Sequence, residues 1–120
     1  MIKPLNRSYK IYNMIFELLS LGEIAADIGK NMRLARAARG LRQEDLAASS
    51  GASLQAIKNL EGGGKVEFMT FLRVAKALNL DKDIWSSCLP KPKSLDELSR
   101  IESVRSESAR VRVARVKAAQ

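Results

Sequence analysis

The pattern of apolar and polar positions predicts five helices between residues 24 and 90 and no strand. Apolar residues recur every three or four positions, as they do on one face of a helix, and helix-breaking residues separate the segments. Gly40 ends the first segment, and the glycine run 62–64 ends the third. We therefore expect an all-α domain with a compact five-helix arrangement. Its helices are expected to cover residues 24–39, 43–49, 53–61, 66–78 and 81–89.

A further helix is expected before this domain, from residue 8 to about residue 21. Apolar residues at helical spacing form one strip along it, and two aromatic residues widen this strip: Ile11, Tyr12, Ile15, Phe16, Leu18 and Leu19. Such a wide strip is unusual for a helix with one face in water. Two interpretations stay open, because the helix either packs on the core of the domain or contacts a second chain.

The C-terminal segment has a different character. Ser94 and Glu97 form the S-x-x-E pattern of a capping box, so a helix is expected to begin there. Its thin apolar stripe is lost after Ser106, among basic residues. Residues 91–120 hold eight basic and four acidic residues, a net charge of +4. We expect this end to be partly disordered when alone and to become ordered on a partner.

The chain is therefore divided into three parts. Residues 1–23 are an N-terminal segment with an amphipathic helix, residues 24–90 are the five-helix domain, and residues 91–120 are a basic tail. A chain of 120 residues has room for one small core with such extensions, but not for two full cores.

The composition argues against an enzyme. The chain has no histidine and a single cysteine, Cys88, which excludes histidine-based acid–base catalysis, an intrachain disulfide and a cysteine-based zinc cluster. Adjacent acidic residues such as Glu44 and Asp45 diverge on a helix and cannot flank a substrate together. The sequence therefore predicts neither a cofactor nor a metal site.

The charge balance indicates an anionic partner. The chain has 21 Lys and Arg residues against 13 Asp and Glu residues, a net charge of +8. A small basic chain of this kind fits nucleic acid, an acidic protein or a membrane surface.

No part of the sequence predicts a membrane span. No stretch approaches the roughly 20 consecutive apolar residues that such a helix needs. The apolar run after Lys10 loosely resembles a signal peptide, but Asn13 and Glu17 interrupt it. We expect a cytoplasmic protein that does not enter the membrane.

Residues 41–61 carry the most informative pattern. Ala47 is small where two helices cross steeply, and Gly51 stands where the turn between them needs a positive φ. Ser53 is placed to cap the following helix. Three apolar residues are expected to point into the core: Leu46, Ile57 and Leu60. At these offsets, the residues predict a helix-turn-helix whose second helix projects from the domain.

Because of these residues and their spacing, the stretch 28–80 resembles the Xre/Cro family of phage-repressor-like DNA-binding domains. The resemblance implies an ion pair between Arg36 and Glu61 that ties the first helix of the domain to the end of the third. This pair has a structural role and is not a DNA contact. The sequence departs from the family's usual residues at three places: Ser50, Leu54 and residues 62–64.

The resemblance also implies DNA contacts at seven residues: Arg42, Gln43, Ser53, Leu54, Gln55, Lys58 and Asn59. Gln43, at the start of the second helix, matches a position that contacts phosphate. Residues 53–55 begin the recognition helix, which enters the major groove. There, Gln55 suits adenine and Leu54 suits a thymine methyl group. The alternative for each of the seven is a solvated side chain with no ligand.

The resemblance further implies a homodimer on a palindromic operator, because one such helix reads only a few base pairs. Two surfaces are candidates for the dimer or partner interface. One is the N-terminal helix around Ile15 and Phe16, and the other is the region around Trp85. Alternatively, Trp85 closes the core of the domain.

The expected function is a sequence-specific DNA-binding transcriptional repressor. Residues 68–78, residues 89–92 and the tail are similar to HipB-type antitoxins of type II toxin–antitoxin modules, which pair with HipA-like kinase toxins. This similarity implies a protein that neutralises a toxin and represses its own operon. One alternative is a stand-alone Xre repressor, for example from a prophage, whose tail clamps DNA nonspecifically. Another is a protein-binding adaptor that has lost DNA contact, which Leu54 and the modest charge of residues 25–61 allow.

Overall fold

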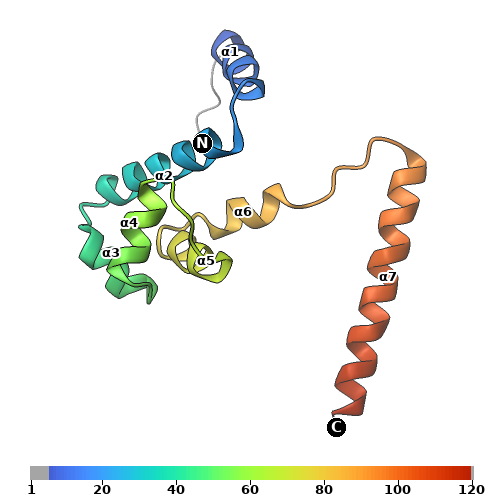
Figure 1. The fold of residues 1–120 in the computed structure, drawn as a ribbon. Coiled ribbons are helices and arrows are strands. Elements are labelled where there is room, and N and C mark those ends of the chain that lie inside the picture. The colour runs from blue at the N-terminus through green and yellow to red at the C-terminus, as the bar shows by residue number, and fades with distance from the viewer. Residues whose placement is uncertain (1–5, 120) are drawn as a thin grey trace. The chain divides into compact units, whose positions relative to one another are not determined.

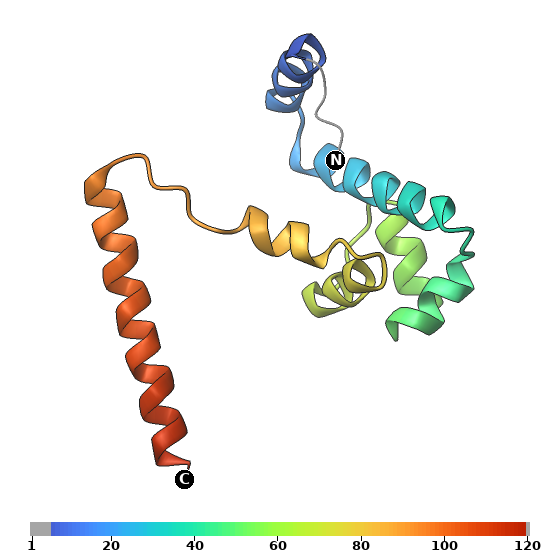
Figure 2. The same cartoon turned by 180° about the vertical axis from the view of Figure 1, so that it is seen from behind.

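The structure, a computed structural model, describes residues 6–119 of the chain, with side chains from residue 10 onward. These residues form helices and no strand, so the all-α fold expected from the sequence is confirmed (Figures 1 and 2). The chain separates into two compact units, Met1–Ile84 and Trp85–Gln120. The helices are α1 (Asn6–Glu17), α2 (Leu21–Ala38), α3 (Gln43–Ser50), α4 (Leu54–Glu61), α5 (Phe68–Ala77), α6 (Asp81–Ser87) and α7 (Leu95–Ala118).

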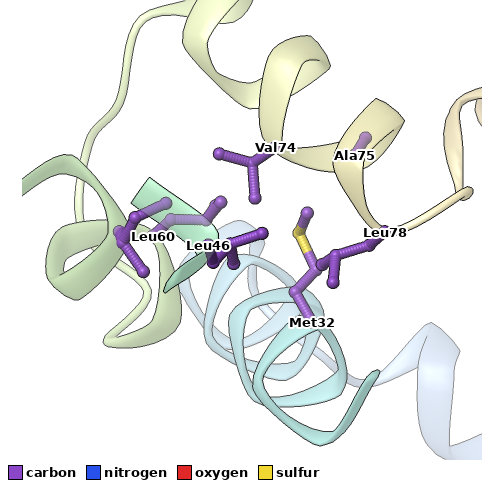
Figure 3. Close-up of a cluster of buried hydrophobic side chains, with 7 residues drawn as sticks. Met32, Leu46, Leu60, Val74, Ala75 and Leu78 are labelled. Atoms are coloured by element: carbon purple, nitrogen blue, oxygen red, sulfur yellow. The ribbon is translucent and has the colours of Figure 1, made fainter. Parts of the chain in front are cut away.

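Helices α2 to α5 pack around one core in the first unit. Helix α2 contacts α4, α3 contacts α4 and α5, and α4 also contacts α5. Figure 3 shows the buried side chains that meet between these helices. Leu46, Ile57 and Leu60 are among them, as the sequence predicted. Burying one large aliphatic side chain contributes roughly 1.5–3 kcal/mol, so this cluster is the main apolar support of the helix-turn-helix. The buried residues are Met32, Leu46, Ile57, Leu60, Val74, Ala75 and Leu78.

Gly29 allows the backbones of α2 and α4 to approach closely. A Cβ atom at this position would overlap the carbonyl oxygen of Leu60 and would lie 3.1 Å from the carbonyl oxygen of Glu61. Gly29 is buried inside α2, where a glycine normally weakens a helix. The absence of a side chain at residue 29 therefore sets the separation of α2 from the end of α4.

The N-terminal apolar segment differs from the single helix expected over residues 8–21. Helix α1 ends at Glu17, and Ser20 begins α2 with a capping box in which its Oγ accepts a hydrogen bond from the Glu23 N–H at 3.2 Å. Every large apolar side chain of α1 from Ile11 onward is exposed, and none belongs to the core. The interpretation that this helix packs on the core is therefore wrong. The physical reason is that the helix is interrupted between Glu17 and Leu21, and this interruption separates α1 from the part of α2 that reaches the core.

The C-terminal segment is one continuous helix, so the expectation of partial disorder is wrong for residues 95–118. Ser94 caps the helix, because its Oγ accepts a hydrogen bond from the Glu97 N–H at 3.1 Å. The predicted capping box is only half formed, since the Glu97 carboxylate accepts its hydrogen bond from the Lys93 N–H instead of from the Ser94 N–H. The helix contains neither Gly nor Pro, and its terminal turns carry charges that complement the helix dipole. It buries no residue. Loss of the apolar stripe after Ser106 thus removes packing of the helix but does not prevent its formation.

Candidate nucleic-acid interface

The turn between α3 and α4 has the conformation that the sequence predicted. Gly51 has a φ of 74°, in the left-handed region that favours glycine. Ser53 Oγ accepts a hydrogen bond from the Ala56 N–H at 3.1 Å and caps α4. Within the turn, Ser50 Oγ accepts a hydrogen bond from the Ala52 N–H at 3.2 Å. These local hydrogen bonds fix the direction in which α4 leaves the turn.

Helix α4 has one buried face and one exposed face. Ile57 and Leu60 are buried in the core, and Leu54 is half-buried. The polar residues that the sequence predicted as DNA contacts lie together at the surface: Ser53, Gln55, Lys58 and Asn59. The first turn of α4 thus presents polar side chains to solvent, which is the arrangement that entry into a major groove requires.

Gln55 and Asn59 hold each other on this exposed face. Gln55 Nε2 donates a hydrogen bond to Asn59 Oδ1 at 3.0 Å. The Gln55 Oε1 atom and the second hydrogen on Nε2 remain directed away from this bond. These are the acceptor and the donor that a carboxamide offers to the edge of adenine. Asn59 therefore restricts the orientation of the Gln55 carboxamide at the surface.

Gln43 links the start of α3 to the end of α4. Its Nε2 donates a hydrogen bond to Glu61 Oε1 at 3.2 Å, and the residue is half-buried. This bond leaves the second hydrogen on Nε2 unused. Sequence reasoning missed this bond, because 18 residues separate the two side chains and no local spacing indicates it.

Glu61 is the centre of a hydrogen-bond network that joins three helices. Arg36 Nε donates to Glu61 Oε2 at 2.7 Å, and Arg36 Nη2 donates to Glu61 Oε1 at 2.9 Å. Arg36 Nη1 also donates to the carbonyl oxygen of Leu41, just before α3, at 2.8 Å. The Arg36 and Glu61 side chains are only 12% and 5% exposed. The pair implied by the family resemblance is confirmed, and its role is structural.

The environment of Glu61 keeps its carboxylate ionised. Burial by itself raises the pKa of Glu61, because it removes water from the charged form. The hydrogen bonds from Arg36 and Gln43, together with the positive charges of Arg36 and Arg33, outweigh burial and hold the pKa below its ordinary value. At neutral pH, the network therefore contains a full negative charge at its centre.

Arg42 lies beside the start of α3, as expected, but it has an acidic neighbour. The Arg42 side chain is 76% exposed, and its Nε lies 3.3 Å from Asp45 Oδ2. The hydrogen bonds from the side chain and the backbone N–H of Arg42 lower the pKa of Asp45. Asp45 offsets part of the positive charge that would meet a phosphate. The i, i+3 spacing of the two residues is the sequence signal for this pair.

The three candidate interface residues all lie at the surface. Trp85 is 66% exposed, so the interpretation that it closes the core is wrong. Ile15 and Phe16 are 53% and 55% exposed on α1. Exposed aromatic and large apolar side chains of this kind are typical of surfaces that another molecule covers.

Residues 32–85 match the family model described as helix-turn-helix. The match includes the whole of α3, α4 and α5 and therefore the exposed face of α4. Residues 32–85 thus form a helix-turn-helix domain, and such a domain points to a DNA-binding regulator of transcription. A search of curated proteins gave no match. Within residues 6–119, no helix combines the length and the apolar character needed to cross a membrane.

Proposed function

We propose that this chain is a sequence-specific transcriptional repressor that binds a palindromic operator as a homodimer, through the first turn of α4. The observation that carries the proposal is the exposed polar face of α4, which buried Ile57 and Leu60 hold outward from the domain. The net charge of +8 favours association with the phosphate backbone. The bound protein excludes RNA polymerase from the promoter, so repression requires no catalysis.

In this proposal, the two helices of the motif have different tasks. Helix α4 reads bases, with Gln55 on adenine and Leu54 on a thymine methyl group. The start of α3 binds phosphate through Arg42 and through the Gln43 amide hydrogen that Glu61 leaves free. The remaining proposed contacts, to phosphate or base edges, are Ser53, Lys58 and Asn59.

Two substitutions on α4 test this function. Gln55→Ala is expected to weaken operator binding by about 1–3 kcal/mol and to relax the preference at one base position, because it removes a base contact. Lys58→Ala is the comparison variant, and it should weaken binding to all sequences about equally and reduce the salt dependence by about one phosphate contact. Fluorescence anisotropy with operator variants at several salt concentrations measures both effects.

These binding measurements also distinguish an incorrect assignment of Gln55 as a base contact from an incorrect assignment of the repressor function. Unchanged affinity and base preference in Gln55→Ala would remove Gln55 from the interface. If the wild-type chain does not bind its own promoter at low salt, the repressor function is refuted, and the protein-binding adaptor is favoured. The half-buried Leu54 and the pairing of Arg42 with Asp45 are the observations that support the adaptor.

We further propose that the chain is the antitoxin of a type II toxin–antitoxin module and binds a HipA-like kinase toxin. The exposed Trp85 and the long helix α7, which buries no residue, supply surface for such a partner. Co-expression with the product of the neighbouring gene is expected to give a complex that copurifies and binds the operator more tightly than the chain alone. Failure to recover a complex, together with the absence of an adjacent kinase gene, would favour a stand-alone Xre repressor. In that case, the basic residues of α7 would serve as a nonspecific DNA clamp.

A further inference from the structure

Helix α1 is apolar around most of its circumference, although it is exposed. One strip consists of Tyr12, Ile15 and Phe16, and a second strip consists of Ile11, Met14 and Leu18, just past the end of the helix. The six side chains are 53–85% exposed. Lys10, Asn13 and Glu17 occupy the remaining side of α1, so the helix is amphipathic with a wide apolar face. An exposed apolar face of this width is typical of a surface that another segment or molecule covers.

The first strip lines one side of a groove whose other side is α2, although its side chains stay 53–73% exposed. Tyr12, Ile15 and Phe16 line a groove of about 270 Å³ together with Ile24 and Ile28, which lie in the first half of α2. The second strip does not contribute to this groove. Ile11, Met14 and Leu18 thus remain available for a second molecule.

The charges beside the second strip indicate what this molecule is. Lys10 and Glu17 lie seven residues apart, which places them two turns apart on the same edge of α1. They flank Ile11 and Met14. In an antiparallel pair of α1 helices, Lys10 of each copy faces the partner's Glu17, so both ends of the apolar strip are closed by opposite charges. A parallel pair would place Lys10 against Lys10 and Glu17 against Glu17.

We propose that the strip Ile11–Met14–Leu18 is a homodimer interface in which α1 pairs antiparallel with α1 of a second copy. The interface is isologous, since the same residues face each other across a two-fold axis. Glu17 lies on the same edge as Lys10 and would repel an anionic membrane or nucleic acid, whereas the Lys10 and Glu17 arrangement is complementary to itself. The proposal deepens the homodimer in the proposed function and rests on it only for the use of the dimer on DNA.

A charge exchange tests the antiparallel arrangement directly. The full chain is measured without DNA by light scattering over a concentration series, and the wild type is expected to reach twice its mass of 13.3 kDa. Lys10→Glu and Glu17→Lys are each expected to raise the dimer dissociation constant about tenfold, because two ion pairs become repulsive contacts. An equimolar mixture of the two variants should restore dimerisation, since every contact between the unlike copies is again between opposite charges.

A matched pair of apolar substitutions locates the interface. Ile11→Asp is expected to abolish the dimer, whereas Val116→Asp on α7 should leave it intact. The two side chains are 56% and 57% exposed, so neither substitution disturbs the core. Circular dichroism checks that both variants remain helical.

Three results would overturn the proposal. They are a wild type that is monomeric at every concentration, charge variants that dimerise as the wild type does, and loss of the dimer in Val116→Asp with retention in Ile11→Asp. The last result would place the interface on α7. A wild type that dimerises as proposed but does not bind its promoter would refute the repressor function and leave the interface standing.

Discussion

Gly29→Ala is expected to lower the free energy of unfolding by about 3 kcal/mol, because the added methyl group has no space between α2 and α4. The Cβ atom would overlap the carbonyl oxygen of Leu60 and would crowd that of Glu61. Both are backbone atoms, so no flexible side chain can move aside. The two helices must separate, and the packing of Leu60 in the core is lost with them. Urea unfolding followed by circular dichroism measures the change.

Gly22→Ala is the matched control, because both glycines lie inside α2 and neither has a positive φ. A Cβ at residue 22 would meet only Ser20 Oγ, at 3.9 Å. This variant is expected to stabilise the protein by about 0.5–1 kcal/mol through the higher helix propensity of alanine. If both variants have wild-type stability or greater, the close approach of α2 to α4 is not required for folding.

The helix-turn-helix could be predicted from the sequence because local properties of the chain encode it. Gly51 and Ser53 act on their immediate neighbours, through a positive φ and through one capping hydrogen bond. Ile57 and Leu60 lie three residues apart on α4, so their common burial follows from the helical periodicity. Signals between residues this close in the sequence can be interpreted without knowing which helices contact each other.

The contacts within the candidate site could not be predicted in the same way. Gln43 and Glu61 meet only because α3 packs against α4, and a third helix also approaches the end of α4 closely at Gly29. In the sequence, Gln43 therefore looked like a free phosphate ligand. In the structure, one of its two amide hydrogens is already used.

At the two ends of the chain, the sequence pattern separates two questions: whether a segment is helical, and what the helix packs against. For α1, the apolar pattern correctly indicated a helix but did not specify which molecule covers it. For α7, the weak apolar pattern suggested disorder, although the segment contains no Gly or Pro and begins with an N-cap hydrogen bond at Ser94. Helix propensity and capping decide whether such a segment is helical, while apolar periodicity decides only what it packs against.

Glu61→Gln is expected to lower the free energy of unfolding by about 2–3 kcal/mol at neutral pH. The glutamine amide cannot neutralise Arg36, whose side chain is only 12% exposed and would keep an unpaired charge. Its NH₂ group would also face the hydrogen-bond donors of Arg36 or Gln43. Because Glu61 joins the ends of α2, α3 and α4, operator affinity should fall as well.

The effect of Glu61→Gln is expected to depend on pH. The folded pKa of Glu61 lies below its unfolded value, so the ionised carboxylate contributes its full stabilisation above the unfolded pKa of about 4.3. This contribution is lost as the pH falls through the folded pKa. The difference in unfolding free energy between wild type and variant should therefore be largest at neutral pH and shrink as the pH falls below the unfolded pKa of Glu61. Asp45 also has a lowered pKa, but it is present in both proteins and cancels from the difference.

Glu102→Gln is the control for Glu61→Gln, because it removes a carboxylate from an exposed ion pair instead of from the buried network. Glu102 pairs with Arg105 at 3.4 Å, but these side chains are 56% and 61% exposed. Water screens this pair, so its loss should cost less than about 1 kcal/mol at any pH. If Glu61→Gln behaved in the same way as Glu102→Gln, the Arg36–Glu61–Gln43 network would not hold the helix-turn-helix together. The orientation of α4 would then depend on apolar packing around Leu46, Ile57 and Leu60 alone.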